Sequence, residues 1–324
     1  MCSMIRSALV CLSCVVSFAS LEANEESSES GPESRGAITG GPLRVHSDHP
    51  RYFASAGGEG GASPAPGDER SRDVLFTCDF EDDDWRDGWT SSRNDGRCET
   101  IASDPERGFE PLRGKALRIR VDKGGHYGAS LLYEFREETG EEPEEIYFRY
   151  YLRFASDWDP RRGGKLPGIS GTYGRAGWGG RPADGKNGWS ARGLFEGQKD
   201  GKTPVGYYCY HADMKGRYGS HWRWEEGGRG LLENDRWYAI EQYAKMNTPG
   251  ENDGVLRAWV DGELAFEKTD VRMRDVDSLK IEAVWINVYL GGSWTAESEH
   301  HLYIDEVAIS KAPIGMLDAG KDRP

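Results

Sequence analysis

Short runs of alternating apolar and polar residues, separated by Gly, Pro, Asp and Asn, dominate the chain from residue 73 onward. In residues 146–154 every second side chain is apolar, so a strand would place these side chains on one face, whereas a helix would scatter them. Strand-forming runs are also found at residues 74–77, 116–121, 236–246, 281–290 and 302–309. These patterns predict β-strands throughout this part of the chain.

Residues 255–268 carry the clearest hairpin signal. Asp261 and Gly262 stand between two alternating runs, and an Asp-Gly pair favours the type I′ turn that joins antiparallel strands. No regular helical pattern separates the predicted strands, which argues against parallel βαβ winding. We therefore predict an all-β fold, an antiparallel β-jelly roll or sandwich, as a single domain over residues 73–313.

The first 72 residues carry no strand pattern. Arg6 precedes an apolar run that ends at Ala19, which predicts a signal peptide over residues 1–19 and a secreted protein, extracellular or periplasmic, with no membrane segment after cleavage. An uncleaved anchor and a lipid on Cys14 are the weaker alternatives. Residues 20–72 are rich in Glu, Ser, Gly and Pro and predict a disordered linker. We also expect a disordered tail over 314–324.

Three of the six cysteines lie in the predicted signal peptide. Of the others, Cys78 and Cys98 form the most plausible disulfide, because they are close in sequence and export permits the bond. No CxxC or HExxH spacing indicates zinc, and we expect no cofactor. The acidic segment 79–84 could supply oxygen ligands to a structural calcium ion, although solvated loop acids explain it better.

Charge changes the picture only when it is resolved along the chain. The 55 acidic and 41 basic residues give a net charge of −14, which argues against a nucleic-acid partner. Residues 161–223, however, contain twelve Lys and Arg and only four Asp and Glu, a local charge of +8. Such a basic centre would attract an anionic ligand, and an uneven but solvated surface is the alternative.

The same window is rich in Gly, Trp and Tyr. Tyr208 and Tyr210 are two residues apart on a predicted strand and share a face, as do Ser190 and Arg192. If the two strands are neighbours, a hydroxyl, a guanidinium and two phenols converge. Ordinary strand filling is the alternative for the tyrosines. Five further residues of the window are candidates for substrate binding: Arg175, Trp178, Trp189, His211 and Arg223.

The sequence offers weak support for hydrolysis. Glycosidases need two carboxylates that flank the bond, but Asp305 and Glu306 are adjacent and would point to opposite faces of a strand. A groove with Lys, Arg and Tyr suits β-elimination from a uronic acid polymer, in which the C5 proton is removed and the C4–O bond breaks. Lys and Arg can neutralise the carboxylate, and a phenol can act as base or acid.

The string GGKLPG at residues 163–168, followed by Ser-x-Arg and then Tyr-x-Tyr, resembles polysaccharide lyase family 14. The similarity continues through residues 246–250 and 258–262 to 291–294, and it covers about residues 140–311. The family includes alginate and glucuronate lyases. The resemblance therefore implies a concanavalin A-like jelly roll and an anionic polysaccharide substrate. It places the catalytic residues on Lys165, Ser190, Arg192, Tyr208 and Tyr210.

By that resemblance, Lys165 and Arg192 bind and neutralise the uronate carboxylate, and one of the two tyrosines takes or gives the proton. Three features depart from the family pattern, namely residues 169–174, Trp189 before the Ser-x-Arg motif and a long segment at 196–206. They affect the expected substrate more than the reaction. We expect a monomer whose only partner is the polysaccharide. The alternatives are a non-catalytic, lectin-like carbohydrate-binding module and, more weakly, a glycosidase with acids placed elsewhere.

Overall fold

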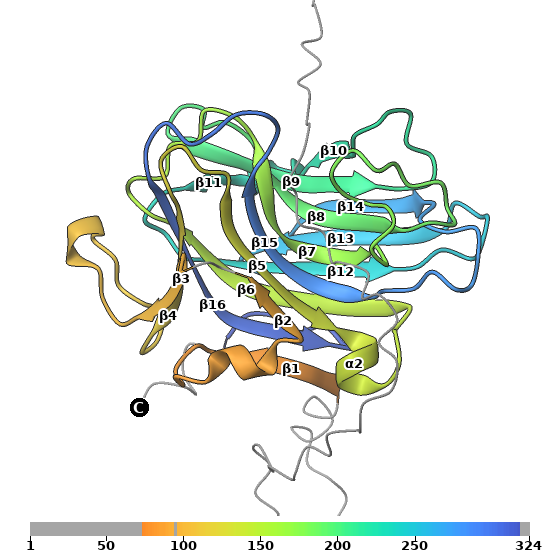
Figure 1. Ribbon diagram of the computed structural model, residues 1–324, viewed down its shortest axis with the longest axis horizontal. Coiled ribbons are helices and arrows are strands. Elements are labelled where there is room, and N and C mark those ends of the chain that lie inside the picture. Colours follow the sequence, from red (N-terminus) through yellow and green to blue (C-terminus); the bar gives the residue numbers. More distant parts are fainter. Residues whose placement is uncertain (1–72, 94–95, 318–324) are drawn as a thin grey trace, which may run out of the picture.

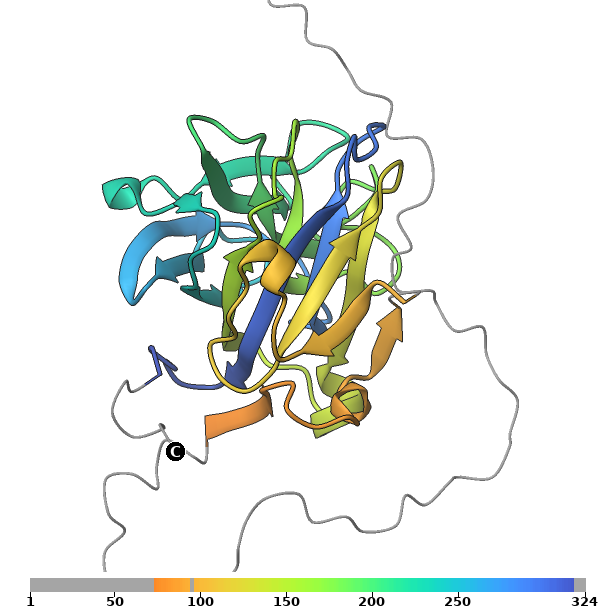
Figure 2. The same ribbon diagram turned by 90° about the vertical axis from the view of Figure 1, so that its left-hand side faces the viewer.

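The computed structural model describes residues 73–93 and 96–317 (Figure 1). The predicted signal peptide and linker lie outside these residues. Two antiparallel sheets of eight strands each make up the fold, which confirms the predicted all-β jelly roll. Figure 2 shows the same strands after a rotation of 90°.

The first sheet runs in the order β14-β13-β12-β6-β16-β4-β3, and β1 also pairs with β16 (Figure 1). Three of its strand pairs, β3-β4, β12-β13 and β13-β14, join consecutive strands, and the other four join distant parts of the chain. Its strands are β1 Val74–Cys78, β3 Cys98–Ile101, β4 Ala116–Val121, β6 Glu145–Phe154, β12 Tyr238–Lys245, β13 Gly254–Val260, β14 Glu263–Val271 and β16 His300–Ser310.

The second sheet runs in the order β10-β9-β8-β7-β15-β5-β2, and β11 pairs with β9. Four of its strands fall within the basic window of the sequence. Its strands are β2 Ser91–Arg93, β5 Tyr127–Glu134, β7 Gly164–Gly171, β8 Trp189–Phe195, β9 Lys202–Tyr210, β10 Ser220–Arg223, β11 Leu231–Glu233 and β15 Ala283–Leu290.

The main hydrophobic core lies between the two sheets. From β6 it receives Ile146, Phe148 and Tyr150, which is the alternation that the sequence predicts. Burying large apolar side chains of this kind contributes about 1.5–3 kcal/mol each, so the alternating strands fix which face of each sheet is inside. The opposite faces of both sheets are left for loops and polar side chains.

The predicted hairpin is confirmed. β13 and β14 pair across Asp261 and Gly262, whose φ angles of +52° and +78° are both positive, as a type I′ turn requires. The helices among the described residues are α2, Phe135–Thr139, and short 3-10 turns at Trp85–Gly88, Pro105–Arg107 and Glu226–Gly228. No helix in the described part of the chain is long and apolar enough to cross a membrane.

Two predictions about the ends of the domain are wrong. Cys78 and Cys98 are free thiols, because they lie on β1 and β3, which pair with different strands of the first sheet.

The residues that follow β16 are also ordered further than expected. The backbone N–H groups of Ile314 and Gly315 donate to the Glu241 carboxylate at 3.0 and 2.8 Å, so the predicted tail cannot begin at 314. The tail after residue 317 lies outside the described residues.

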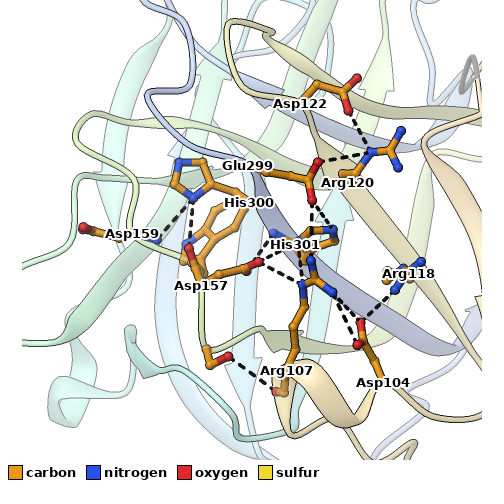
Figure 3. A network of polar contacts seen from close by, with 12 residues as sticks. Asp104, Arg107, Arg118, Arg120, Asp122, Asp157, Asp159, Glu299, His300 and His301 are labelled. Atoms are coloured by element: carbon orange, nitrogen blue, oxygen red, sulfur yellow. Dashed lines mark hydrogen bonds and ion pairs between the residues drawn. The ribbon is translucent and has the colours of Figure 1, made fainter.

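Figure 3 shows a network of ion pairs that includes His301 on β16. Leu302 and Ile304 enter the core between the sheets, so His301 points to the outer face of the first sheet. Arg107 donates from Nε to Asp157 at 3.0 Å and from Nη1 to Asp104 at 3.2 Å. His301 Nδ1 lies 2.7 Å from the Asp157 carboxylate, and Arg118 donates to Asp104 at 2.8 Å. We call this group the first-sheet network. Its cations and carboxylates alternate, so they neutralise one another.

Candidate active site

The outer face of the second sheet gathers most of the residues that the sequence singles out. In the antiparallel register Ser190 is opposite Tyr210, and Arg192 is opposite Tyr208. Residues opposite one another on neighbouring strands share a face of the sheet. The predicted convergence of Ser-x-Arg with Tyr-x-Tyr is therefore present, with β8 and β9 as the two strands. Lys165 on β7 joins them from the other side of β8.

A cleft of about 820 Å³ opens over this face. Lys165 and Tyr208 line it, and the other three predicted catalytic residues lie beneath or beside it. Its walls come from the start of β7, from β8 to β10 and from the loop after β15. The remaining lining residues are Arg162, Gly163, Gly164, Leu194, Glu196, Gly197, Gly216, Arg217, Tyr218, His221, Gly291, Gly292, Ser293 and Trp294.

Lys165 is held between aromatic rings. Its Nζ lies 4.6 Å from the ring centre of Tyr208 and 5.2 Å from that of Tyr289. The negative face of an aromatic ring attracts a cation, so the two rings orient the ammonium group and leave its positive charge in place. A Cβ atom on Gly291 would lie only 2.8 Å from the same Nζ. Glycine at this position therefore leaves room for the lysine.

Arg192 lies directly beneath the cleft and is fully buried. Its guanidinium carbon is 5.6 Å from the ring centre of Tyr208 and 5.1 Å from that of Trp285, and its Nη1 donates to Asn287 Oδ1 at 3.2 Å. Two positive charges therefore lie near the Tyr208 ring, one from β7 and one from β8. They can stabilise negative charge that develops on the phenol or on a bound carboxylate.

The two tyrosines differ in access. Tyr208 lines the cleft, and its ring packs edge-on against His221 with 5.1 Å between ring centres. Tyr210 is fully buried, and its hydroxyl accepts a hydrogen bond from the backbone N–H of Gly180 at 3.1 Å. Ser190 is buried as well and donates to the Gly177 carbonyl at 2.6 Å. Tyr210 and Ser190 thus hold the loop between β7 and β8, whereas Tyr208 faces the cleft.

The predicted substrate-binding residues are dispersed. Trp189 is completely buried in the core and donates to the Lys280 carbonyl, so the prediction that it contacts substrate is wrong. His211 faces away from the cleft, because it is one residue beyond Tyr210, and it bonds with Ser220 at 2.9 Å. Burial lowers its pKa below the ordinary histidine value.

The other three candidates do not line the cleft. Trp178 is 2% exposed, with Arg181 over its ring, and Arg175 is exposed on the same loop, over the ring of Tyr173. Arg223 is also exposed and pairs with Glu196, which does line the cleft. Arg223 therefore lies at the edge of the cleft, where it partly cancels the charge of Glu196.

Several site residues escaped the sequence prediction. On β15, Trp285, Asn287 and Tyr289 alternate with apolar residues that enter the core. A polar Asn in such a pattern indicates that its face of the strand is turned away from the core. This outward face of β15 could have been recognised in the sequence. Trp294 could not, because its place depends on how loops far apart in sequence meet, whereas His221 lies opposite Tyr208 on β10, the strand that follows β9.

The sequence comparisons give the family. The family model described as Polysaccharide lyase 14 matches residues 114–307, more than half of the chain. No curated protein matches the chain. The matched range includes β7, β8 and β9 and therefore every residue of the predicted catalytic set.

Solved structures share the fold at low sequence identity. Alginate lyase Aly36B is 20% identical, with a TM-score of 0.60, over 74% of this chain and 98% of that one. Alginate lyase vAL-1 from Chlorella virus is 20% identical, with a TM-score of 0.58, over 74% and 100%. The PL-14 alginate lyase from Aplysia kurodai is 18% identical, with a TM-score of 0.56, over 73% and 98%. The chain belongs to the polysaccharide lyase 14 family and is a polysaccharide lyase.

Proposed function

We propose that this lyase cleaves a uronic-acid-containing polysaccharide of the alginate or glucuronan type by β-elimination. The observation that carries the proposal is that Lys165 and Arg192 both lie close to the ring of Tyr208, which lines the cleft. A uronate ring bound there would find two cations for its carboxylate and a phenol for its proton. Alginate lyases with the same fold support the choice of an anionic polymer.

The cations act first. Lys165 and Arg192 neutralise the uronate carboxylate, which makes the C5 proton acidic and stabilises the negative charge that forms when this proton leaves. Tyr208 in its phenolate form removes the proton. The electron pair of the C5–H bond forms the C4–C5 double bond, and the C4–O bond breaks. The departing oxygen then takes a proton from the Tyr208 phenol, so one residue can serve as base and acid in turn.

Tyr208 is preferred over Tyr210 for this role because of access. Only Tyr208 lines the cleft, whereas the Tyr210 hydroxyl accepts the Gly180 N–H inside the protein. Tyr210 and Ser190 are then positioning residues that hold the β7–β8 loop. We also propose that the enzyme is secreted as a monomer, from the signal peptide at residues 1–19.

A panel of uronic acid polymers tests the proposal. Incubation should give an unsaturated, ultraviolet-absorbing chain end, and product masses should be lower by one water than those of a hydrolase. The Tyr208→Phe variant should lose about 10²–10⁴-fold in kcat, which is the usual contribution of a positioned acid or base. Tyr147→Phe, on the first sheet, is the matched control. Full activity of Tyr208→Phe, or binding without product, would overturn the assignment.

A further inference from the structure

Two arginines that line the cleft carry charges that no acid of the described residues neutralises. Arg162 lies just before β7, and Arg217 lies in the loop between β9 and β10; both are exposed and both line the cleft. In the part of the chain that the structure describes, neither of them pairs with a carboxylate. Glu196, which also lines the cleft, is already engaged by Arg223. The positive charges of Arg162 and Arg217 therefore remain open to an anionic ligand.

Arg162 and Arg217 lie at opposite ends of the strands beneath the cleft. The first residue of β7 pairs with the last residue of β8, so Arg162 lies near the end of β8. The last residue of β9 pairs with the second residue of β8, so the loop that carries Arg217 lies near the start of β8. Tyr208 is opposite Arg192, the middle residue of β8, and therefore lies between Arg162 and Arg217. A ligand that reaches both of these arginines must extend past Tyr208.

Both ends of the cleft are held in place by hydrogen bonds that do not use these two guanidinium groups. Beside Arg162, the Gly163 carbonyl accepts a hydrogen bond from the Trp294 indole at 3.3 Å. In the loop between β9 and β10, the Asp213 carboxylate accepts a hydrogen bond from Arg272 at 2.7 Å. The backbone at both ends is therefore positioned before a ligand arrives, which reduces the entropy that is lost on binding.

A polymer of consecutive uronates carries one carboxylate on every sugar ring. In the proposed function Lys165 and Arg192 bind the carboxylate of the ring that is cleaved, so the carboxylates of the neighbouring rings need cations of their own. We propose that Arg162 and Arg217 bind the carboxylates of sugars on either side of that ring, so that the enzyme prefers a run of at least three uronates. The inference rests on the proposed function and adds the pattern of charge that the substrate must carry.

The size of the cleft agrees with a ligand of several rings. Sites for drug-sized molecules have volumes of about 300–1,000 Å³, and the cleft of about 820 Å³ is near the upper limit. A polymer in which uronates alternate with neutral sugars would leave Arg162 and Arg217 without a carboxylate when a uronate is being cleaved. Contacts made equally in the bound substrate and in the transition state lower KM and leave kcat unchanged. The alternating polymer should therefore have a higher KM.

Steady-state kinetics of charge-removing variants, on a uronate polymer that gives product, test the inference. Arg162→Ala and Arg217→Ala should each raise KM by about two- to five-fold at low salt, the usual effect of one exposed ion pair, and should leave kcat unchanged. The increase should disappear at about 1 M salt, which screens exposed charges. Arg161→Ala and Lys215→Ala are the matched controls, because both residues are exposed and close in sequence but do not line the cleft. Both controls should keep the KM of the unmodified enzyme.

Oligouronates of defined length test the same point without a variant. The KM of the unmodified enzyme should fall as the oligomer becomes long enough to reach both ends of the cleft. Any of three results would overturn the inference alone: a KM that does not depend on length, an unchanged KM in both arginine variants, or an equal increase in the control variants. If the unmodified enzyme gives no unsaturated product from any uronate polymer, the proposed function fails and the inference fails with it.

Discussion

The outer faces of the two sheets both carry buried charge, but they use it differently. In the first-sheet network Arg107 lies among Asp104, Asp157 and Glu299, so each cation meets an acid (Figure 3). In the cleft, Lys165 and Arg192 meet the rings of Tyr208, Tyr289 and Trp285. The first arrangement cancels charge within the protein, whereas the second orients it toward the solvent side.

The comparison shows why basic residues alone are a poor guide to a binding site. An aromatic ring attracts a cation by about 0.5–2 kcal/mol without neutralising it. A carboxylate partner removes the field that an anionic ligand would detect. The kind of neighbour that holds a cation, more than the number of cations, separates a binding face from a supporting one.

The largest expected effect is on activity. Lys165→Ala removes the ammonium group from the cleft and should lower kcat/KM by about 10²–10³-fold. This is the usual loss when one donor is removed from a site that stabilises an oxyanion. The Lys165 ammonium packs over the rings of Tyr208 and Tyr289, and the midpoint of thermal unfolding of the variant should change by only a few degrees. Initial rates of ultraviolet-absorbing product measure the first effect, and circular dichroism measures the second.

Lys199→Ala, on an exposed loop after β8, is the matched control for loss of a lysine charge. It should keep nearly full activity. If the two lysine variants lost activity equally, the cleft would be no more important than the general surface charge, and the contrast between the two faces would disappear.

The next effect is on stability. Arg107→Ala leaves the nearly buried Asp104 with Arg118 as its remaining cation and should lower the free energy of unfolding by about 1.5 kcal/mol, the usual contribution of a hydrogen bond between charged groups. Activity of the folded variant should stay unchanged, because the network faces away from the cleft. Urea unfolding and steady-state kinetics on the same preparation make the test. A large fall in kcat without a loss of stability would contradict it.

Acid should weaken the first-sheet network. Burial alone would raise the pKa of Asp157, but its contacts with His301 and Arg107 hold this pKa below the ordinary value. A carboxylate whose folded-state pKa is lowered stabilises the fold above its unfolded pKa of about 4, and the contribution is lost as the pH falls below that value. Urea unfolding at a series of pH values below about 5 should show this loss. An equal loss in Arg107→Ala would assign it to other carboxylates.

The smallest effect concerns Glu196. Among the described residues that line the cleft, it is the one with a carboxylate. Arg223 pairs with it and partly cancels its charge. Glu196→Gln makes the cleft more positive, so KM for an anionic polymer should fall by about two- to five-fold at low salt, and the change should vanish at high salt. Kinetics at two salt concentrations measure it. A KM that rises would show that the acid contacts the substrate directly.

The sequence predicted most of the fold because alternation decides which face of a strand is buried. Residues 116–121 match β4 residue for residue, and Asp261-Gly262 forms the predicted turn. The convergence of Ser190, Arg192, Tyr208 and Tyr210 was also predictable, since strands β8 and β9 are consecutive in the chain and pair directly.

The rest depended on contacts between distant segments. Trp189 was predicted to bind substrate, yet it is buried in the core. Neighbouring residues of a strand point to opposite faces, so the prediction that Ser190 faces the cleft side already implied that Trp189 faces the core. Cys78 and Cys98 are close in sequence, but β1 pairs with β16 and β3 pairs with β4, and no local pattern reveals this. Sequence proximity is a weak guide in a sandwich whose neighbouring strands come from opposite ends of the chain.

The absence of a disulfide among the described residues affects how this domain can be made. Burial raises the pKa of the Cys78 and Cys98 thiols to about 12, and Cys209 is buried as well. Only a thiolate attacks another sulfur, so these side chains exchange slowly with oxidants. Refolding from urea should therefore proceed equally well in reducing and in oxidising buffer.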